Sequence, residues 1–445
     1  MITTHKSIPI NRIEPWLVVF SASLFFFFAF MQINLFNALN SSLYRDFHLT
    51  DATALGNFSA TYMYATVLLL FPAGIILDRV STRKVIIIAM TACVFCTGLF
   101  SFTNNLWQAE LCRLVTGAGG AFCFLSCVRL ASRWFESKHM ALIVGLIVTF
   151  AMTGAMLAQT PFTALTNAFG WRNALRIDAT AGLLMLWIIL LYVRDYPSGA
   201  QPFFEAQHAA LEKIGFWPAL RSVAINAQNW LGGLYVSLVN LPVFLLGSTW
   251  GSWYLIQTHH LTEIQSSLVI SALFVGMIIG SPVVGWISDT LEQRRAPMMA
   301  GAIVSLAAIA AIMYLPNLGL IALLFAFFAL GFVISFQILG YPLIAESNPS
   351  ALTGTAEGLA SVLIMAGGFF IPVFPMLLNS TWDHRMQNGI PLYTTVDYHH
   401  AFMIMPIAFV LSFIIAFFAK ETCCLSFEAR TNSTTLRMEC CDVAQ

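Results

Sequence analysis

The sequence predicts an all-α polytopic membrane protein with twelve transmembrane helices in two pseudo-repeated six-helix bundles. Three observations predict it: the composition is very apolar, long apolar runs recur along the chain, and one charged motif occurs in both halves. Of the 445 residues, 58% are hydrophobic and only 9% are charged, whereas a soluble domain has about 25% charged residues. Lipid must therefore solvate much of the surface. The net charge of zero gives no reason to expect a nucleic acid as partner.

Twelve apolar runs are long enough to cross a bilayer, which takes about 20 residues in a helix. Backbone groups inside lipid have no water to bond, so each run is expected to be helical. The predicted spans are residues 16–38, 53–77, 85–103, 107–131, 141–165, 174–194, 230–255, 264–287, 297–315, 319–343, 353–380 and 399–419.

The basic residues predict how these spans are oriented. With the N-terminus in the cytoplasm, most of the 21 Lys and Arg fall on the inner side, and only Arg45, Arg172 and Arg385 fall outside. This agrees with the positive-inside rule and places both termini in the cytoplasm. We expect a cytoplasmic tail rather than a signal peptide at the start. The predicted segments are a tail at 1–15, a bundle at 16–194, a cytoplasmic linker at 195–229, a second bundle at 230–419 and a tail at 420–445.

A charged motif joins the second and third spans of each half. In GIILDRVSTRK, Gly74 and Asp78 are four residues apart, and Arg83 follows five residues later. The second half repeats this spacing at Gly285, Asp289 and Arg294. A second repeated feature is an acid at the end of a span: Glu136 ends the fourth span and Glu346 ends the tenth. Together they indicate a parallel internal repeat.

The first motif, with Arg79 directly after the aspartate, resembles the signature of the major facilitator superfamily between spans two and three. The fourth span adds the family-like pattern RLVTGAG, which begins at Arg113. The resemblance covers the whole chain and departs from the family at Ser81, where a glycine is usual. It implies two bundles around a central substrate site that opens to each face in turn.

The resemblance also implies a gate at the inner side of the cleft. Asp78 would lie at the start of span eleven, near 353–354, where the helix dipole favours a carboxylate. Arg83 would meet Glu136, and Arg294 would meet Glu346. The alternative is that these basic residues only fix the topology. The predicted gating residues are Gly74, Asp78, Arg79, Arg83, Glu136, Gly285, Asp289, Arg294 and Glu346.

Polar side chains inside the spans are the candidates for substrate binding. Asn34, Asn37 and Asn40 are three residues apart and form a stripe, which is costly against lipid. We expect the stripe to line the cavity; hydrogen bonding between helices is the alternative. Arg113 suits a substrate carboxylate because guanidinium binds it with two hydrogen bonds. The predicted substrate-binding set is Gln32, Asn34, Asn37, Tyr62, Tyr64, Arg113, Tyr235, Asn240, Gln337 and Tyr341.

Three acids inside the spans are candidate proton carriers. These are Glu110, Glu357 and, third in order, Asp178. Glu110 is three residues before Arg113 and can pair with it on one helix face. Structural pairing is an equal alternative for each acid, whereas an unpaired carboxylate would be able to carry a proton.

The stretches GNFSATYMY (56–64), SRWF (132–135) and GWR (170–172) are similar to amino-acid transporters of intracellular bacteria that live in phagosomes. This finer resemblance implies proton-coupled uptake of amino acids or nucleosides across a bacterial inner membrane. The alternatives are transport of a siderophore or drug-like compound in either direction, and a non-transporting sensor on the same fold. No catalytic constellation is present, so an enzyme is not expected. We expect a small-molecule substrate, protons and lipid as partners, a monomer, and neither a cofactor nor a metal.

Overall fold

The computed structural model describes residues 13–49, 51–135, 140–197, 216–315, 318–349, 352–387, 390–425 and 427. Most of the predicted N-terminal tail, much of the linker, Glu136 and most of the C-terminal tail lie outside these residues. The described chain is almost entirely helical, and its one sheet is a two-stranded hairpin.

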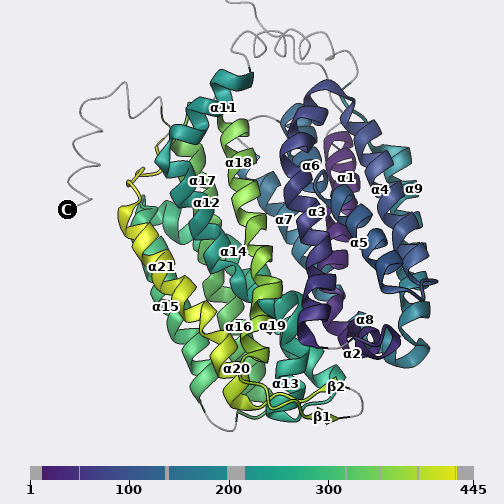
Figure 1. Cartoon of the computed structure of the whole chain (residues 1–445). Coiled ribbons are helices and arrows are strands. Elements are labelled where there is room, and N and C mark those ends of the chain that lie inside the picture. The colour runs from purple at the N-terminus through teal and green to yellow at the C-terminus, as the bar shows by residue number, and fades with distance from the viewer. Residues whose placement is uncertain are drawn as a thin grey trace, which may run out of the picture.

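The first half forms one bundle (Figure 1). Its helices are α1 (Glu14–Asn34), α2 (Phe36–Asp46), α3 (Ala52–Arg79), α4 (Thr82–Phe100), α5 (Leu106–Gly120), α6 (Cys123–Trp134), α7 (Met140–Leu157), α8 (Thr160–Phe169) and α9 (Trp171–Tyr192). Spans one, four and five are each divided into two consecutive helices.

The second half forms the neighbouring bundle (Figure 1). It begins with α11 (Phe216–Ile225), α12 (Ala227–Val239), the π-helix η2 (Val243–Trp250), α13 (Gly251–His259), α14 (Glu263–Leu291) and α15 (Arg295–Tyr314). It continues with α16 (Leu320–Ile334), η3 (Ser335–Leu339), α17 (Gly340–Glu346), α18 (Thr353–Ala366), η5 (Gly367–Phe369) and α19 (Phe370–Asn379). The hairpin β1 (Met386–Gln387) and β2 (Ile390–Pro391) precedes α20 (Thr395–Phe402) and α21 (Ile404–Phe418).

The predicted fold class is confirmed. Among the described residues, 11 helical stretches are long and apolar enough to cross a membrane, and up to 12 if the bent pair Ala227–Val239 and Val243–His259 is one span. That pair bends by 41° at a break that contains Pro242, which has no backbone N–H to continue the helix.

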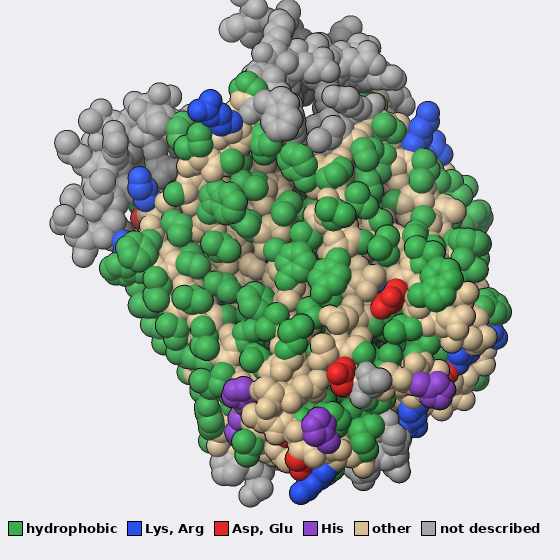
Figure 2. Space-filling model, viewed as in Figure 1, with side chains coloured by type: hydrophobic (Ala, Val, Ile, Leu, Met, Phe, Trp, Pro, Cys, Tyr) green, Lys and Arg blue, Asp and Glu red, His purple; other side chains and the backbone are tan. Residues whose placement is uncertain are grey.

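The surface carries the exposed apolar side chains that a lipid-solvated bundle requires. Figure 2 shows hydrophobic side chains spread over the middle of the visible face, with Lys and Arg toward both ends and His near the lower end of the view. Leu68, Ile321 and Phe325 are each at least 70% exposed. Exposed apolar side chains on this scale mark contact with lipid or a partner.

The two ends of the molecule are distinguished by their loops. We call the end that carries β1 and β2 the hairpin end, and the opposite end, where α3 and α14 finish, the motif end (Figure 1). In the predicted orientation, the hairpin end is outside and the motif end is cytoplasmic.

Candidate functional site

The first span is interrupted between α1 and α2, and this break frees main-chain oxygens near the middle of the molecule. Carbonyls at a helix end have no partner within the helix and must find one elsewhere. The oxygen of Gln32 accepts a hydrogen bond from Nη1 of Arg113 (2.7 Å), and that of Asn34 accepts one from Nε2 of Gln159 (3.1 Å). The break in span one therefore recruits polar side chains from spans four and five.

Span seven is interrupted in a comparable way, and its π-helix η2 presents carbonyls to the other bundle. Asn37 Nδ2 donates to the main-chain oxygens of Leu246 (2.8 Å) and Gly247 (2.6 Å). Asn37 Oδ1 accepts from the main-chain nitrogen of Ser252 (3.1 Å). Asn40 donates to the main-chain oxygen of Thr249. The asparagine stripe thus forms hydrogen bonds between helices in this conformation, and contact with substrate stays a prediction.

The contacts between the bundles are asymmetric. Within the described residues, every recorded hydrogen bond between the bundles joins residues 37–59 or 159–160 to residues 246–271 or 379. One example is Thr160 Oγ1 with Ser271 Oγ (2.8 Å), and another is Asn379 Nδ2, which donates to Thr53 Oγ1 (2.9 Å). All these residues lie from the helix breaks toward the hairpin end, which is therefore closed.

Apolar side chains also join α3 and α18 across the bundles, and Ala73, directly before Gly74, belongs to this packing. On α3 and α18, Leu70 and Met365 belong to one apolar cluster. Nearer the motif end of these two helices, a Cβ atom added at Gly74 or Gly358 would have no atom of a described residue within 4 Å. Gly285 has the same open surroundings. These three glycines have no described packing partner, and the side chains of Asp78 and Arg79 lie outside the described residues.

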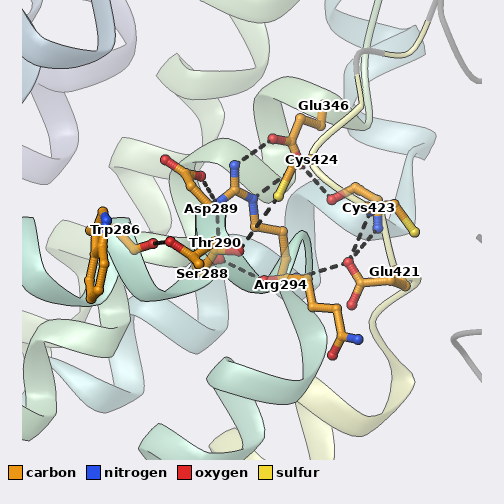
Figure 3. Close-up of polar contacts among 11 residues, drawn as sticks. Trp286, Ser288, Asp289, Thr290, Arg294, Glu346, Glu421, Cys423 and Cys424 are labelled. Carbon is orange, nitrogen blue, oxygen red and sulfur yellow. Dashed lines mark hydrogen bonds and ion pairs between the residues drawn. The ribbon is translucent and has the colours of Figure 1, made fainter.

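The second charged motif forms a buried ionic cluster (Figure 3). Arg294 Nη2 lies 2.9 Å from Glu346 Oε1, and Nη1 lies 2.7 Å from Asp289 Oδ1 and 2.9 Å from Ser288 Oγ. Burial would lower the pKa of the Arg294 guanidinium, but Glu346 and Asp289 outweigh it and raise that pKa. The predicted contact between Arg294 and Glu346 is therefore present. Both residues belong to the second bundle, so this contact does not itself join the two bundles.

The described part of the first motif contacts the end of α9 and the residues that follow it. The Arg83 main-chain nitrogen donates to Asp195 Oδ1 (3.0 Å), and its Nη2 donates to the oxygen of Leu190 (3.0 Å). The side chains of Asp78 and Arg79, and all of Glu136, lie outside the described residues. Their gating contacts stay predictions.

Each bundle has an acid, absent from the predicted site, three residues after its last helix. Asp195 follows α9, accepts from Arg83 as above and is 3.4 Å from Arg133 Nη1. Glu421 follows α21, and its two carboxylate oxygens accept from the main-chain nitrogens of Arg294 and Arg295, each at 2.8 Å. Both acids thus bind backbone N–H groups at the start of the bundle's third span, where the helix dipole favours negative charge.

The segment that carries Glu421 is anchored on both sides. The main-chain nitrogen of Lys420 donates to Oε1 of Gln228 on α12 (2.9 Å), and the hydroxyl of Thr422 donates to Glu346. Cys424 Sγ lies against the oxygen of Ser288, and burial raises the pKa of its thiol to about 11. Residues 420–424 therefore lie against the ionic cluster, and Figure 3 shows Glu421, Cys423 and Cys424 beside Arg294.

A second buried polar cluster lies within the first bundle. Gln32 Nε2 donates to Asp178 Oδ2 (2.6 Å), and Thr97 Oγ1 donates to Gln32 Oε1 (3.2 Å). Arg113, bonded to the main chain of Gln32, lies over the rings of Phe36 (4.6 Å) and Tyr62 (4.9 Å). Arg113 and Asp178 are only 2% and 3% exposed. Gln32 thus links two buried charges that spans four and six contribute.

The remaining predicted residues have different surroundings. Tyr235 is fully buried and donates to the oxygen of Met298 (2.8 Å), so it ties helices of the second bundle together. Tyr64 is 37% exposed and stacks on Phe369 of the other bundle. Glu110 is half-buried and forms no ion pair with Arg113 in the described structure, so the pairing that their spacing allows is absent in this conformation. Of the predicted residues in the second bundle, Asn240, Gln337, Tyr341 and Glu357 are half-buried.

Comparison with known proteins identifies the family. The model of the major facilitator superfamily matches residues 22–372 and 234–423. The chain belongs to this superfamily.

Relatives within the major facilitator superfamily carry names from several substrate classes. The probable galactarate/D-glucarate transporter GudP of Bacillus subtilis (strain 168) is 24% identical over 380 residues, which cover 77% of this chain and 81% of the relative. The membrane sensor protein UhpC of Salmonella typhimurium is 26% identical over 314 residues, which cover 67% and 70%. The finer resemblance to phagosomal amino-acid transporters has no support among these relatives.

Solved structures of the superfamily share the fold. A D-xylose-proton symporter has a TM-score of 0.71 at 15% identity, and the match covers 93% of this chain and 100% of that one. A bacterial homolog of the human lysosomal transporter Spinster, inward-facing and unoccupied, has a TM-score of 0.69 at 16% identity, with 92% and 96% covered. This facilitator therefore has the two-bundle architecture that its repeat predicts.

Proposed function

We propose that the protein is a secondary active transporter that takes up a small organic nutrient across a bacterial inner membrane by alternating access. The observation that carries this proposal is the asymmetry between the two ends. Within the described residues, the recorded hydrogen bonds that join the bundles all lie from the helix breaks toward the hairpin end. With the orientation predicted from the basic residues, such a state is closed toward the outside, as expected of one of the two states of alternating access.

For the substrate, we propose a small hydroxylated carboxylate. Arg113 supports this, because it is a buried cation with no carboxylate within ion-pair distance in the described structure, and its recorded hydrogen bond goes to a main-chain oxygen. Guanidinium binds carboxylate with two parallel hydrogen bonds. Relatives named for galactarate, D-glucarate and D-galactonate point to the same class. Amino acids also carry a carboxylate and belong in the test, whereas nucleosides do not.

For the coupling ion, we propose a proton that binds at Asp178. One carboxylate oxygen accepts from Gln32, and the other is buried without a recorded partner. A buried carboxylate with an unfilled oxygen is better accommodated when protonated, because burial disfavours the charged form. Gln32 contacts both Asp178 and Arg113, so this one residue couples protonation of Asp178 to the proposed substrate-binding cation. Glu357, half-buried on α18, is the second candidate.

Proteoliposomes with an imposed pH gradient test this proposal. We expect accumulation of a radiolabelled sugar acid, with D-glucarate, D-galactonate, glucose 6-phosphate, glutamate and uridine compared side by side. Arg113→Ala should abolish uptake, whereas Arg176→Ala, which removes a guanidinium that lies over Phe102, should not. Asp178→Asn should retain exchange of substrate for substrate but lose accumulation driven by the pH gradient. Uptake of uridine alone would contradict the carboxylate assignment.

A sensor is the second candidate, because UhpC, a relative at 26% identity, is named as a membrane sensor protein. A sensor would bind its ligand without moving it. Binding detected by a rise in melting temperature, with no substrate exchange in proteoliposomes, would favour the sensor over the transporter.

A further inference from the structure

Gln159 occupies the break between α7 and α8, and it is completely buried. The next residues are Thr160 and Pro161, which begin α8, and proline is well tolerated only in the first turn of a helix. Gln159 therefore lies outside both helices, and its side chain is free to bond to neighbouring segments rather than to its own.

The single amide nitrogen of Gln159 connects the two bundles. Nε2 donates to the main-chain oxygen of Asn34 (3.1 Å), which ends α1 in the first bundle. It also donates to the oxygen of Gly247 (2.9 Å), which lies in η2 of the second bundle. Both acceptors belong to interrupted spans, so Gln159 contacts the breaks of span one and span seven at the same time.

The helix that carries Gln159 is fixed tightly to the first bundle. Gly154 on α7 packs so closely on α1 that a Cβ there would lie 2.3 Å from the oxygen of Phe27. The bond to Asn34 is thus between elements of one closely packed body. The bond to Gly247 crosses to the other body and must break when the hairpin end opens.

We propose that Gln159 is a positioning residue that latches the hairpin end closed by bonding both interrupted spans through one amide. This inference rests on the proposed alternating access. The side-chain amide of Gln159 has two N–H groups on one nitrogen. Leucine has no N–H group in its side chain, and an ionised glutamate has only hydrogen-bond acceptors. Asn37, which also donates to Gly247, is the second member of the latch.

The test measures the separation of the bundles rather than transport. Spin labels at Asn105→Cys and Glu263→Cys, both exposed at the hairpin end, report that distance in full-length protein whose native cysteines are replaced. In Gln159→Leu, the loss of the one hydrogen bond that crosses to Gly247 should lower the ratio of closed to open molecules by about threefold to tenfold. Gln159→Glu should do the same at neutral pH and recover partly at acid pH, because a protonated carboxyl can donate one hydrogen bond.

The controls make the outcome specific. Asn173→Asp removes an amide that donates to the main-chain oxygen of Phe169, in the same bundle. It should therefore leave the distance distribution unchanged. Asn37→Asp should open the hairpin end, which provides a second reading if Gln159→Leu does not fold. An unchanged distribution in folded Gln159→Glu and Asn37→Asp would overturn the latch even if transport is normal. A shifted distribution in a protein that transports no substrate would support the latch and contradict the proposed function.

Discussion

Arg294→Gln should destabilise the second bundle substantially, because it removes the cation that two carboxylates share. The side chains of Arg294 and Glu346 are 8% and 14% exposed, so this pair is nearly buried. Removal of one partner from a buried pair costs about 3–5 kcal/mol. Glu346 keeps its hydrogen bond from Thr422, so we expect about 2–3 kcal/mol here. Asp289 is 68% exposed, and its pair adds at most about 1 kcal/mol.

Thermal unfolding in detergent measures this effect. If the second bundle unfolds as a unit of about 200 residues, a loss of this size lowers its melting temperature by roughly 5–10 °C. Arg385→Gln is the matched control, because Arg385 pairs with Asp383 at the same 2.7 Å but with both side chains exposed. Glu346→Gln combined with Arg294→Gln should cost less than the sum of the single changes. A melting temperature for Arg294→Gln that equals that of Arg385→Gln would refute the assignment of a buried ionic cluster.

Further predictions concern other polar contacts. Glu421→Gln should lower stability by about 1 kcal/mol, because the neutral amide loses the charge interaction of the carboxylate with the start of α15. The melting temperature measures this loss, and an unchanged value would mean that the carboxylate is solvated instead. Partial burial alone would raise the pKa of Asp46, but hydrogen bonds from Trp171 and Arg172 outweigh it and hold that pKa below its usual 3.8. Ionised Asp46 thus stabilises the fold above pH 3.8, and the stabilisation is lost as pH falls through the lowered pKa. A melting-temperature difference between wild type and Asp46→Asn should therefore shrink below pH 3.8, and a constant difference would contradict it. Finally, Gln32→Leu removes the side-chain bond to Asp178 but keeps the main-chain oxygen that Arg113 contacts, so it should weaken the pH dependence of carboxylate binding, measured by titration calorimetry. An unchanged pH dependence would show that Asp178 does not act through Gln32.

Sequence reasoning predicts the fold because hydrophobicity and charge act through composition and spacing. The apolar runs identify the spans, and the resemblance to the superfamily implies that Arg294 meets Glu346. The predicted spans already place both residues of this contact in the second bundle, so the contact itself cannot join the bundles. A role of this pair in the gate stays a prediction.

Contacts to main-chain oxygens are the part that sequence reasoning misses. Gln159 and Asn37 bond to carbonyls that are available only because spans one and seven are interrupted. Any residue type presents the same carbonyl, so no letter in the sequence marks the acceptor. The asparagine stripe is visible, but the choice between cavity lining and helix contact depends on where the breaks lie. Glu421 is missed for a related reason, because the apolar run ends at 419 and the next residues resemble a tail.

The anchored segment after α21 has a practical consequence for work with this protein. A truncation or an affinity tag placed directly after residue 419 would remove or displace Glu421 and Thr422, and with them the contacts to α15 and Glu346. Expression vectors should therefore keep the chain through at least Leu425 before any fusion partner begins. A shortened version that purifies poorly would then report a lost helix cap rather than an unsuitable detergent.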